Sequence, residues 1–405
     1  MIAKPFFVAL LLAGISRAGE VPNIVLIMAD DLGVECLGAY GGSSYATPRL
    51  DALAETGQKY LHCHSTPKCS PSRVTLLTGR YTFRTTRKWG FIPRDEISFG
   101  QILKRAGYAT ALAGKWQLGR IVDDPGIIQH FGFDTHCVWG WHEGPRYWNP
   151  VIWQDGAIRK DVAKRYGPDL YTEFLIDFIE SNRKGPFLAY YPMCLTHFPK
   201  SPEPPGPNGK KESFKEMVEH MDREVGRLVD ALDRLKLRER TLILFTADNG
   251  SPTNVTSIRN GEKITGGKGK LTDAGTHVPL IANWPGTVSP GEPDTLVDFS
   301  DFLPTLTGLG KGDFPKDRVM DGRSFAGSLL GIRGPSRDWI FTEWEGRSWV
   351  RARNWKLYGD GQLFDLRNDP RERRALSPYS DDADRARMRA WLGSKMAMLE
   401  VPPGK

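Results

Sequence analysis

A cysteine, an arginine and two pairs of oxygen-bearing residues are the side chains of this sequence best suited to chemistry. Cys69 stands at the start of a short segment that is typical of a helix, and Arg73 lies one turn further on. A helix N-terminus offers unpaired N–H groups and partial positive charge, which suits an anion. Two apolar runs end in the pairs Asp30-Asp31 and Asp248-Asn249. A nucleophile, an anion site and a cation site together indicate hydrolysis of a charged ester.

The two pairs offer only oxygen ligands of use to a cation, namely those of Asp30, Asp31, Asp248 and Asn249. Such a set suits a hard ion such as calcium or magnesium rather than zinc. Either pair alone could equally be a helix cap or a turn. Two pairs, both at the ends of expected strands, favour a metal site.

Five cysteines follow the N-terminal segment, and an odd number in an exported protein indicates one special thiol. If Cys69 is that thiol, three pairings of the other four are possible, and all four could equally be buried free thiols. Cys69 could instead form a disulfide with Cys63, be a buried thiol itself, or join its neighbours in a zinc site. The residues concerned are Cys36, Cys63, Cys69, Cys137 and Cys194, and for the zinc site His62, Cys63, His64 and Cys69.

Strands and helices alternate along most of the chain. This alternation predicts an α/β fold, a mostly parallel sheet with helices on both faces. Ligands of such sheets bind beyond the carboxyl ends of the strands, where both oxygen-bearing pairs fall. Strands are expected at 23–29, 108–113, 187–192 and 241–247, and helices at 47–56, 98–106, 169–181 and 213–235.

From residue 339 the pattern changes to short strands at 339–342, 349–352 and 355–358, followed by a helix at 382–399. We interpret this region as a smaller antiparallel sheet with one packing helix. The division expected is a signal peptide at 1–18, a catalytic domain at 19–335 and a C-terminal subdomain at 336–405. The segment 199–211, rich in Pro, Gly and Lys, is expected to be an exposed loop.

The N-terminus is typical of a secretory signal, with Lys4, an apolar stretch at 6–15 and small residues at Ser16-Arg17-Ala18. No apolar stretch is long enough to span a bilayer, so we expect an exported protein, periplasmic or extracellular. The formal net charge of +7 is either a matter of solubility or an attraction to polyanions such as sulfated polysaccharide. The basic residues are dispersed, which argues against nucleic acid. Oligomeric state is not indicated.

The run Cys69-Ser70-Pro71-Ser72-Arg73, with Leu77-Thr78-Gly79-Arg80 after it, resembles the signature of the type I, formylglycine-dependent sulfatases of the Cys type. Further blocks of that family follow its order at 23–31, 114–116, 196–197, 247–250 and 267–269. The resemblance covers nearly all of the expected mature chain. It implies an alkaline-phosphatase-like sandwich with the C-terminal subdomain described above.

The same resemblance implies that a maturation enzyme oxidises Cys69 to formylglycine (3-oxoalanine). One hydroxyl of the formylglycine hydrate would attack sulfur, and the other would later expel sulfate. Asp248 would be both a metal ligand and the base for the attacking hydroxyl. The metal implied is calcium, with magnesium as runner-up, and its ligands would be Asp30, Asp31, Asp248, Asn249 and the residue made from Cys69.

Four cationic or ionisable residues take roles by resemblance. Arg73 would orient the hydrate and neutralise charge, and Lys115 would contact a sulfate oxygen and the formylglycine. His197 and Lys268 would contact the bridging oxygen and stabilise the leaving alcohol, His197 being the better proton donor. Spacing to the run 273–279 favours Lys268 over Lys270.

Gln117 departs from the family, which often has His at this position. A glutamine can donate a hydrogen bond to a sulfate or hydrate oxygen, but it cannot exchange a proton near neutral pH. The departure puts base assistance to sulfate expulsion in doubt. The block Asp273-Ala274-Gly275, where Glu-Gly-Gly is common, has no direct chemical consequence.

Substrate recognition is expected from the aromatic segment 139–150, with His142 and Arg146 as binding residues. Sugars stack on aromatic faces, and Arg suits sulfate or carboxylate. The alternative is that these tryptophans only pack a long loop onto the body. Further candidates in the C-terminal region are Trp344, Glu345, Arg347 and Trp349.

Three functions remain open at this level. The first is a secreted sulfatase that cleaves sulfate monoesters, on a carbohydrate substrate. The second is a phosphate or phosphonate ester hydrolase built on the same scaffold. The third is a non-catalytic binder of sulfated glycans, which would follow if Cys69 is not oxidised or if Gln117 disables turnover.

Overall fold

A computed structural model of the protein describes residues 21–86, 88–197, 213–332, 334, 336–377, 382–399 and 401. The expected signal peptide at 1–18 and the expected loop at 199–211 lie outside these residues. Among the helices described, none combines the length and the apolar character that a membrane span requires.

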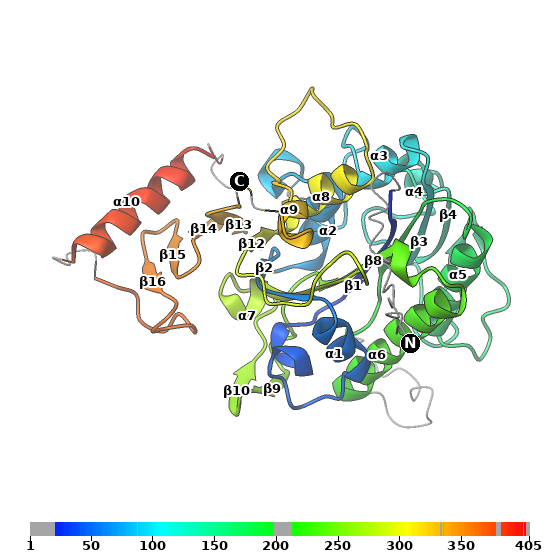
Figure 1. The fold of residues 1–405 in the computed structure, drawn as a ribbon, viewed down its shortest axis with the longest axis horizontal. Coiled ribbons are helices and arrows are strands. Elements are labelled where there is room, and N and C mark those ends of the chain that lie inside the picture. The colour runs from blue at the N-terminus through cyan, green and yellow to red at the C-terminus, as the bar shows by residue number, and fades with distance from the viewer. Residues whose placement is uncertain are drawn as a thin grey trace, which may run out of the picture.

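A ten-stranded sheet forms the centre of the molecule (Figure 1), with the order β12-β2-β11-β8-β1-β7-β3-β4-β5-β6. Eight of its strands run in the same direction, while β11 and β5 run antiparallel to both of their neighbours. The strands are β1 (Asn23–Ala29), β2 (Gln58–His64), β3 (Ala109–Lys115), β4 (Thr135–Trp139), β5 (Trp153–Gln154), β6 (Ala157–Ile158), β7 (Phe187–Pro192), β8 (Thr241–Ala247), β11 (His277–Asn283) and β12 (Leu296–Asp298).

Helices cover both faces of this sheet (Figure 1), as the alternation of elements predicts. On one face α1 (Pro48–Glu55) and α5 (Gly167–Ser181) pack against α6 (Phe214–Arg234); on the other, α8 (Phe302–Leu309) packs against α2 (Cys69–Thr78) and α3 (Phe99–Arg105). The shorter elements are α4 (Ile127–His130), α7 (Asp273–Thr276), α9 (Ala326–Leu329) and a hairpin of β9 (Thr256–Arg259) and β10 (Glu262–Thr265).

Local signals in the sequence explain where these helices begin. Ser213 and Glu216 form a reciprocal capping box at the start of α6, and Ser98 and Gln101 form another at the start of α3. The ends of the observed helices therefore differ from the ends expected from the sequence by at most about two residues. This is the usual uncertainty in assigning helix ends. The expected strand at 108–113 instead extends to Lys115, so that this lysine is the last residue of β3.

Gly114 makes that extension possible. Its φ of +113° lies in the left-handed region, and a Cβ built there would meet the Pro192 carbonyl oxygen of β7 at 2.2 Å. Glycine alone adopts this conformation without strain and lets the two strands approach so closely. The glycine therefore delivers Lys115 to the edge of the sheet beside β7.

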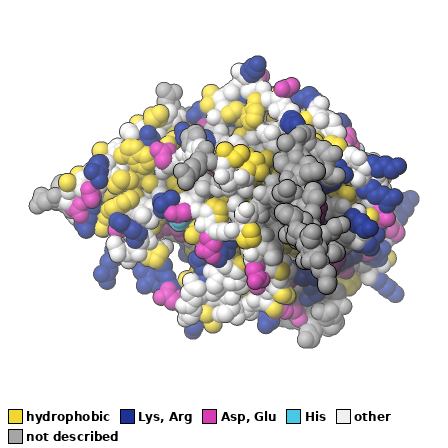
Figure 2. Space-filling view, in the orientation of Figure 1, with side chains coloured by type: hydrophobic (Ala, Val, Ile, Leu, Met, Phe, Trp, Pro, Cys, Tyr) yellow, Lys and Arg dark blue, Asp and Glu magenta, His cyan; other side chains and the backbone are white. Residues whose placement is uncertain are grey.

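The C-terminal region forms the expected smaller sheet with one helix. Its antiparallel strands are in chain order, β13 (Ile340–Trp344), β14 (Arg347–Arg351), β15 (Trp355–Tyr358) and β16 (Leu363–Asp365), and α10 (Ala383–Ala397) packs against β14 and β15. Hydrophobic side chains gather over this lobe, at the left of Figure 2. On the same face, Lys and Arg are dispersed rather than collected in one block.

All five cysteines of the described chain are buried free thiols. Of the possibilities open from sequence, the structure therefore has neither a Cys63–Cys69 disulfide nor a pairing of the other four. His62, Cys63, His64 and Cys69 do not come together as a metal-binding group among the described residues.

His64, the last residue of β2, is a buried histidine whose ring nitrogens lack hydrogen-bond partners among the described residues. Its ring stacks on His277 at 4.9 Å. Burial, reinforced by the positive charge of Arg351, lowers the pKa of His64 well below its ordinary value. The ring is therefore neutral in the folded state at neutral pH.

We expect His64→Phe to flatten the acid dependence of stability. Below about pH 6.5 the unfolded chain binds a proton at His64 that the folded chain does not, so wild-type stability falls by up to about 1.4 kcal/mol per pH unit from this group. The phenylalanine variant lacks that loss. Urea denaturation across pH 7 to 5 measures it, with His142→Phe, an exposed histidine, as control. Equal slopes for wild type and His64→Phe would contradict the prediction.

Candidate active site

The carboxyl ends of four neighbouring strands meet at one edge of the central sheet. In the order β8-β1-β7-β3, these ends deliver Asp248, Asp30, His197 and Lys115. Because β8 and β1 are parallel neighbours in register, with Met28 opposite Thr246 and Ala29 opposite Ala247, the residues that follow them must lie side by side. The two pairs predicted to share one edge therefore form a single cluster, in agreement with the general position of ligand sites in α/β sheets.

Helix α2 places Cys69 at this edge. All ten of its residues are buried, and no side chain caps its N-terminus. The Ser70 hydroxyl donates to the Gln117 carbonyl at 3.3 Å, and the Ser72 hydroxyl donates to the Thr66 carbonyl at 3.0 Å. The helix ends at Thr78, and Gly79 after it takes the left-handed conformation that suits glycine as a C-cap. Hydrogen bonds from Ser70 and Ser72 thus fix the start of the helix, and Gly79 fixes its end.

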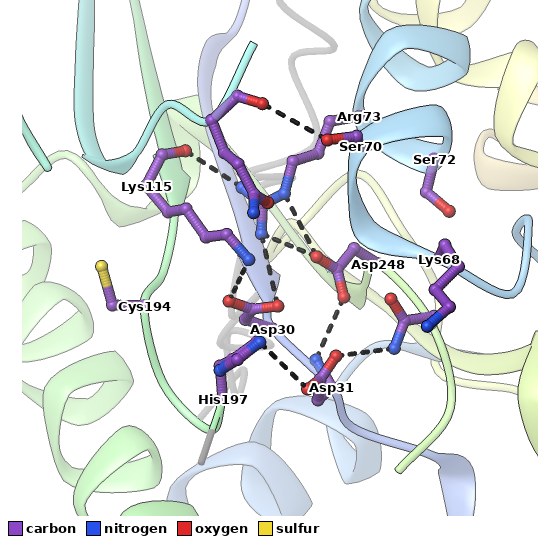
Figure 3. Close-up of polar contacts among 12 residues, drawn as sticks. Asp30, Asp31, Lys68, Ser70, Ser72, Arg73, Lys115, Cys194, His197 and Asp248 are labelled. Carbon is purple, nitrogen blue, oxygen red and sulfur yellow. Dashed lines mark hydrogen bonds and ion pairs between the residues drawn. The ribbon is translucent and has the colours of Figure 1, made fainter. Parts of the chain in front are cut away.

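Three carboxylates and three cations alternate in the cluster, and Figure 3 shows Asp30, Asp31 and Asp248 with Arg73 and Lys115. Lys115 Nζ lies 2.5 Å from Asp30 Oδ2, and Lys268 Nζ lies 2.5 Å from Asp31 Oδ2. The Arg73 guanidinium donates twice to Asp248 Oδ2, from Nε at 3.1 Å and from Nη2 at 2.7 Å. His197 Nε2 stands 3.8 Å from Asp31 Oδ2.

Burial and mutual charge shift the pKa values of these groups. Burial raises the pKa of Asp248, and the neighbouring Asp30 carboxylate raises it further. Burial alone would also raise the pKa of Asp30, but the surrounding cations, Lys115 foremost, together outweigh it and hold that pKa well below its usual range. Burial lowers the pKa of His197 to about 4. Keeping these carboxylates charged and close together in a buried site is therefore electrostatically unfavourable. A bound cation would reduce this repulsion.

The oxygen donors fit a hard cation. Asp30 Oδ1 and Asn249 Oδ1 are buried, and neither has a hydrogen-bond donor within the described residues. The Asn249 amide nitrogen donates to Asp31 Oδ1 at 2.8 Å and to the Gly250 carbonyl at 2.9 Å, which leaves its oxygen as the acceptor. The ligand atoms of Asp30, Cys69 and Asp248 all lie within 4.8 Å of one another. This is a donor set of the kind that calcium and magnesium take.

The loop that carries Lys268 is fastened by the C-terminal sheet. The Leu271 carbonyl accepts from Trp349 Nε1 at 2.7 Å, from Lys356 Nζ at 2.9 Å and from the Tyr358 hydroxyl at 3.2 Å. The fully buried Lys356 also pairs with Asp273 at 3.1 Å. Side chains about 80 residues away in sequence thereby position Lys268.

Gln117 lies at the same edge, two residues beyond β3. It is buried, with a φ of +49°, and its side-chain oxygen has no hydrogen-bond donor among the described residues. Its backbone carbonyl accepts the hydrogen bond from Ser70. Gln117 therefore lies next to the start of α2.

His142 and Arg146 lie on a loop that follows β4, the strand beside β3. The Arg146 guanidinium stacks over the Trp139 ring at 4.4 Å, and Trp139 pairs with Lys115 across β4 and β3. His142 is exposed at a φ of +55°. Trp141 packs on Gly90, whose N–H donates to the Ser70 hydroxyl at 3.1 Å. The aromatic side chains of segment 139–150 thus pack this loop onto the body of the protein. The same loop also lies close to the buried cluster of Asp30, Lys115 and Cys69.

Two residues near the cluster, Cys194 and Thr196, are not among the site residues expected from the sequence. Cys194 stands beside Lys115 and His197 (Figure 3). The Thr196 hydroxyl lies 3.3 Å from the Asp30 carbonyl and 3.2 Å from that of Asp31. In the sequence, only the Thr196-His197 block indicates that this threonine lies near the site. A cysteine that follows an apolar run, such as Cys194, cannot be distinguished from a core residue by sequence alone.

Comparison with known proteins agrees with this geometry. A model of the sulfatase family matches residues 22–312. Human arylsulfatase A is 32% identical over 367 residues, which cover 82% of this chain and 72% of that protein. Mouse N-acetylgalactosamine-6-sulfatase is 28% identical, covering 94% of this chain and 87% of that protein.

Solved structures share the fold. The crystal structure of Ps i-CgsB is 25% identical to this chain, with a TM-score of 0.81, and the match covers 94% of this chain and 93% of that one. The same protein has also been solved in complex with k-i-k-neocarrahexaose, at 24% identity and a TM-score of 0.80. The chain therefore belongs to the sulfatase family and is a sulfuric ester hydrolase.

Proposed function

We propose that the protein hydrolyses sulfate monoesters of a carbohydrate, using formylglycine made from Cys69 and a bound calcium ion. The observation that carries this proposal is the placement of Cys69 Sγ within 4.8 Å of ligand oxygens of Asp30 and Asp248 in one buried cluster. A thiolate itself suits a calcium site poorly because sulfur is a soft ligand. An oxygen-bearing residue at this position removes that mismatch.

Asp30, Asp31, Asp248 and Asn249 would hold the cation, together with the oxidised residue 69. When present, the hydrated formylglycine supplies an oxygen nucleophile for sulfur and a second hydroxyl for release of sulfate. Asp248 would take up the proton of the nucleophile, because its carboxylate lies within 4.8 Å of the residue 69 side chain in the buried cluster. Arg73 and Lys115 would bind sulfate oxygens and neutralise their charge.

His197 and Lys268 would act on the bridging oxygen. Lys268 keeps its proton: burial alone would lower its pKa, but the negative charges around it, Asp31 foremost, together outweigh this and raise the pKa above its ordinary value. Because its pKa is lowered to about 4, His197 is neutral at neutral pH and would donate one N–H to the leaving oxygen. Lys268 thus provides the positive charge and His197 a directed hydrogen bond.

A carbohydrate substrate is favoured by the aromatic loop with Arg146 and by the relatives. One relative is named for sulfated N-acetylgalactosamine, and one structural neighbour binds k-i-k-neocarrahexaose. We further propose export after removal of residues 1–18, maturation of Cys69 by a formylglycine-generating enzyme, and a division into 19–335 and 336–405. Gln117 and His142 would contact the substrate beside Arg146.

Sulfate release tests the proposal. The protein is co-expressed with a formylglycine-generating enzyme and assayed by ion chromatography on an aryl sulfate and on sulfated oligosaccharides. Sulfate release that depends on the maturation enzyme supports the proposal. Release of phosphate from matched phosphate esters at a higher kcat/KM would favour the phosphate ester hydrolase, and binding without release would favour a glycan binder.

Removal of the metal is expected to inactivate the protein by about 100-fold or more, and calcium should restore activity better than magnesium. Calcium at about 100 times its Kd should also stabilise the folded state by about 2.7 kcal/mol. Thermal unfolding with and without calcium measures this separately from activity. Asp30→Asn should weaken the calcium shift, whereas Asp317→Asn, an exposed residue far along the chain, should not. A shift that is unaltered in Asp30→Asn would contradict the ligand assignment.

A further inference from the structure

A buried hydrogen bond between Ser251 and Glu35 joins two segments of the cluster. Ser251 follows Asn249 by two residues. Glu35 belongs to a short 3-10 helix, Val34–Cys36, which begins three residues after Asp31. Both side chains are buried, and the Ser251 hydroxyl donates to Glu35 Oε1 at 2.6 Å across 216 residues of sequence. The segment that carries Asp31 is therefore tied to the segment that carries Asn249.

The hydroxyl of Ser251 uses its full hydrogen-bonding capacity. It accepts from the Gly33 N–H at 3.0 Å, and its oxygen lies 3.3 Å from the sulfur of Cys36. A hydroxyl has one proton to donate and two lone pairs that accept. Because its proton goes to Glu35, the free thiol of Cys36 is the donor in the third contact. One side chain thus holds three neighbouring residues of the other segment.

The absence of a side chain at Gly33 leaves room for the Glu35 carboxylate. A Cβ at Gly33 would meet Glu35 Oε2 at 2.2 Å and Oε1 at 2.5 Å. The φ of Gly33 is −82°, which any residue adopts, so that space rather than backbone conformation favours glycine here. A side chain at this position would push the carboxylate away from the Ser251 hydroxyl.

Backbone hydrogen bonds extend the connection to Lys268. The Leu32 N–H donates to the Asn249 carbonyl at 3.0 Å, and the Lys268 N–H donates to the Ser251 carbonyl at 3.0 Å. The side chains of Asn249 and Asp31 are also hydrogen-bonded to each other. Ser251 is therefore the point at which the segments of Asp31, Asn249 and Lys268 meet. Its hydroxyl fastens the first of these segments, and its carbonyl fastens the third.

We propose that Ser251 and Glu35 are positioning residues that hold Asp31 and Asn249 at the separation that a calcium ion requires. The inference rests on the proposed function for the identity of the ion. Neither residue is among the expected ligands, so both act through the residues that are. Partners that orient metal ligands in this way contribute about 10- to 100-fold to metal affinity. Without them, part of the free energy of calcium binding is used to bring the two segments together.

Calcium titration tests this proposal. The matured protein is freed of metal with a chelator, and the Kd of calcium is measured by isothermal titration calorimetry. We expect Ser251→Ala and Glu35→Leu each to raise this Kd by about tenfold or more. Glu35→Gln should recover most of the affinity, because its side-chain oxygen still accepts from Ser251. Gly33→Ala should also weaken binding, although it alters neither member of the pair.

Ser257→Ala is the matched control for Ser251→Ala. Ser257 is also buried. Its hydroxyl lies 3.0 Å from the Tyr45 hydroxyl and 4.0 Å from the Cys36 sulfur, and within the described structure it does not bridge the two segments. This variant loses the same group from the same kind of environment, so it should lower stability to a similar degree and leave the calcium Kd within about twofold. Equal Kd values for Ser251→Ala and Ser257→Ala would overturn the proposal.

Hydrogen exchange separates this proposal from the proposed function. Exchange of the Leu32 and Lys268 amides is measured in the metal-free protein, where Ser251→Ala should speed it by about tenfold or more and Ser257→Ala should not. If the parent protein binds no calcium, faster exchange in Ser251→Ala would sink the calcium assignment alone and support the positioning of the two segments. Unchanged exchange at both amides would overturn the positioning role whatever the sulfate assay gives.

Discussion

Cys69→Ala is expected to abolish sulfate release, with a fall in kcat of at least about 10⁴-fold, because no other residue of the cluster could supply the nucleophile made from this thiol. Burial raises the pKa of the Cys69 thiol above its ordinary value, so the unmodified side chain is not a ready thiolate. Sulfate release by ion chromatography measures the loss. The mass of the peptide that contains residue 69 shows whether the parent protein carries the aldehyde.

Cys137→Ala is the matched control for this experiment. Cys137 is also a buried free thiol, but it lies within β4 and outside the group that Cys69 forms with Asp30 and Asp248. Its replacement should leave kcat within a few-fold of the parent and cost only the packing of a small side chain. Full activity in Cys69→Ala would remove the proposed mechanism, and equal losses in both variants would point to misfolding.

Arg73→Met is expected to destabilise the protein by about 3–5 kcal/mol and to eliminate turnover. The guanidinium is 1% exposed and makes two hydrogen bonds to Asp248 and one, at 3.0 Å, to the Lys115 carbonyl. Removing it takes these three hydrogen bonds away from a buried carboxylate oxygen and a buried carbonyl. Urea denaturation of the calcium-free protein at neutral pH measures the loss of stability.

Two further variants separate charge from geometry in this pair. Arg73→Met combined with Asp248→Asn should recover part of the stability, because the unpaired carboxylate is gone, but it should recover no activity. Arg94→Met is the control, since its exposed pair with Asp124 is expected to contribute at most about 1 kcal/mol. A loss for Arg73→Met no larger than for Arg94→Met would show that the buried pair does not stabilise the fold.

Much of the fold follows from local patterns. The apolar runs of β1 and β8 are buried along their whole length, as is typical of strands in a parallel sheet. The capping box that starts α6 is visible in the sequence as Ser213 and Glu216. β2 and β11 are not among the strands expected from the sequence, because the run Gln58–His64 mixes charged, aromatic and apolar residues without clear periodicity. Their pairing with the rest of the sheet makes them strands.

The sequence by itself determined which residues could do the chemistry, since oxygen-bearing pairs at strand ends and a thiol at a helix start depend on neighbours in the chain. It could not determine which cation meets which carboxylate. The Asp31 N–H donates to Asp248 across 217 residues, and Lys268 reaches Asp31 across 237. Such contacts are set by the order of strands in the sheet and by close packing. For the same reason, only the tertiary structure decided that the C-terminal sheet fastens the Lys268 loop.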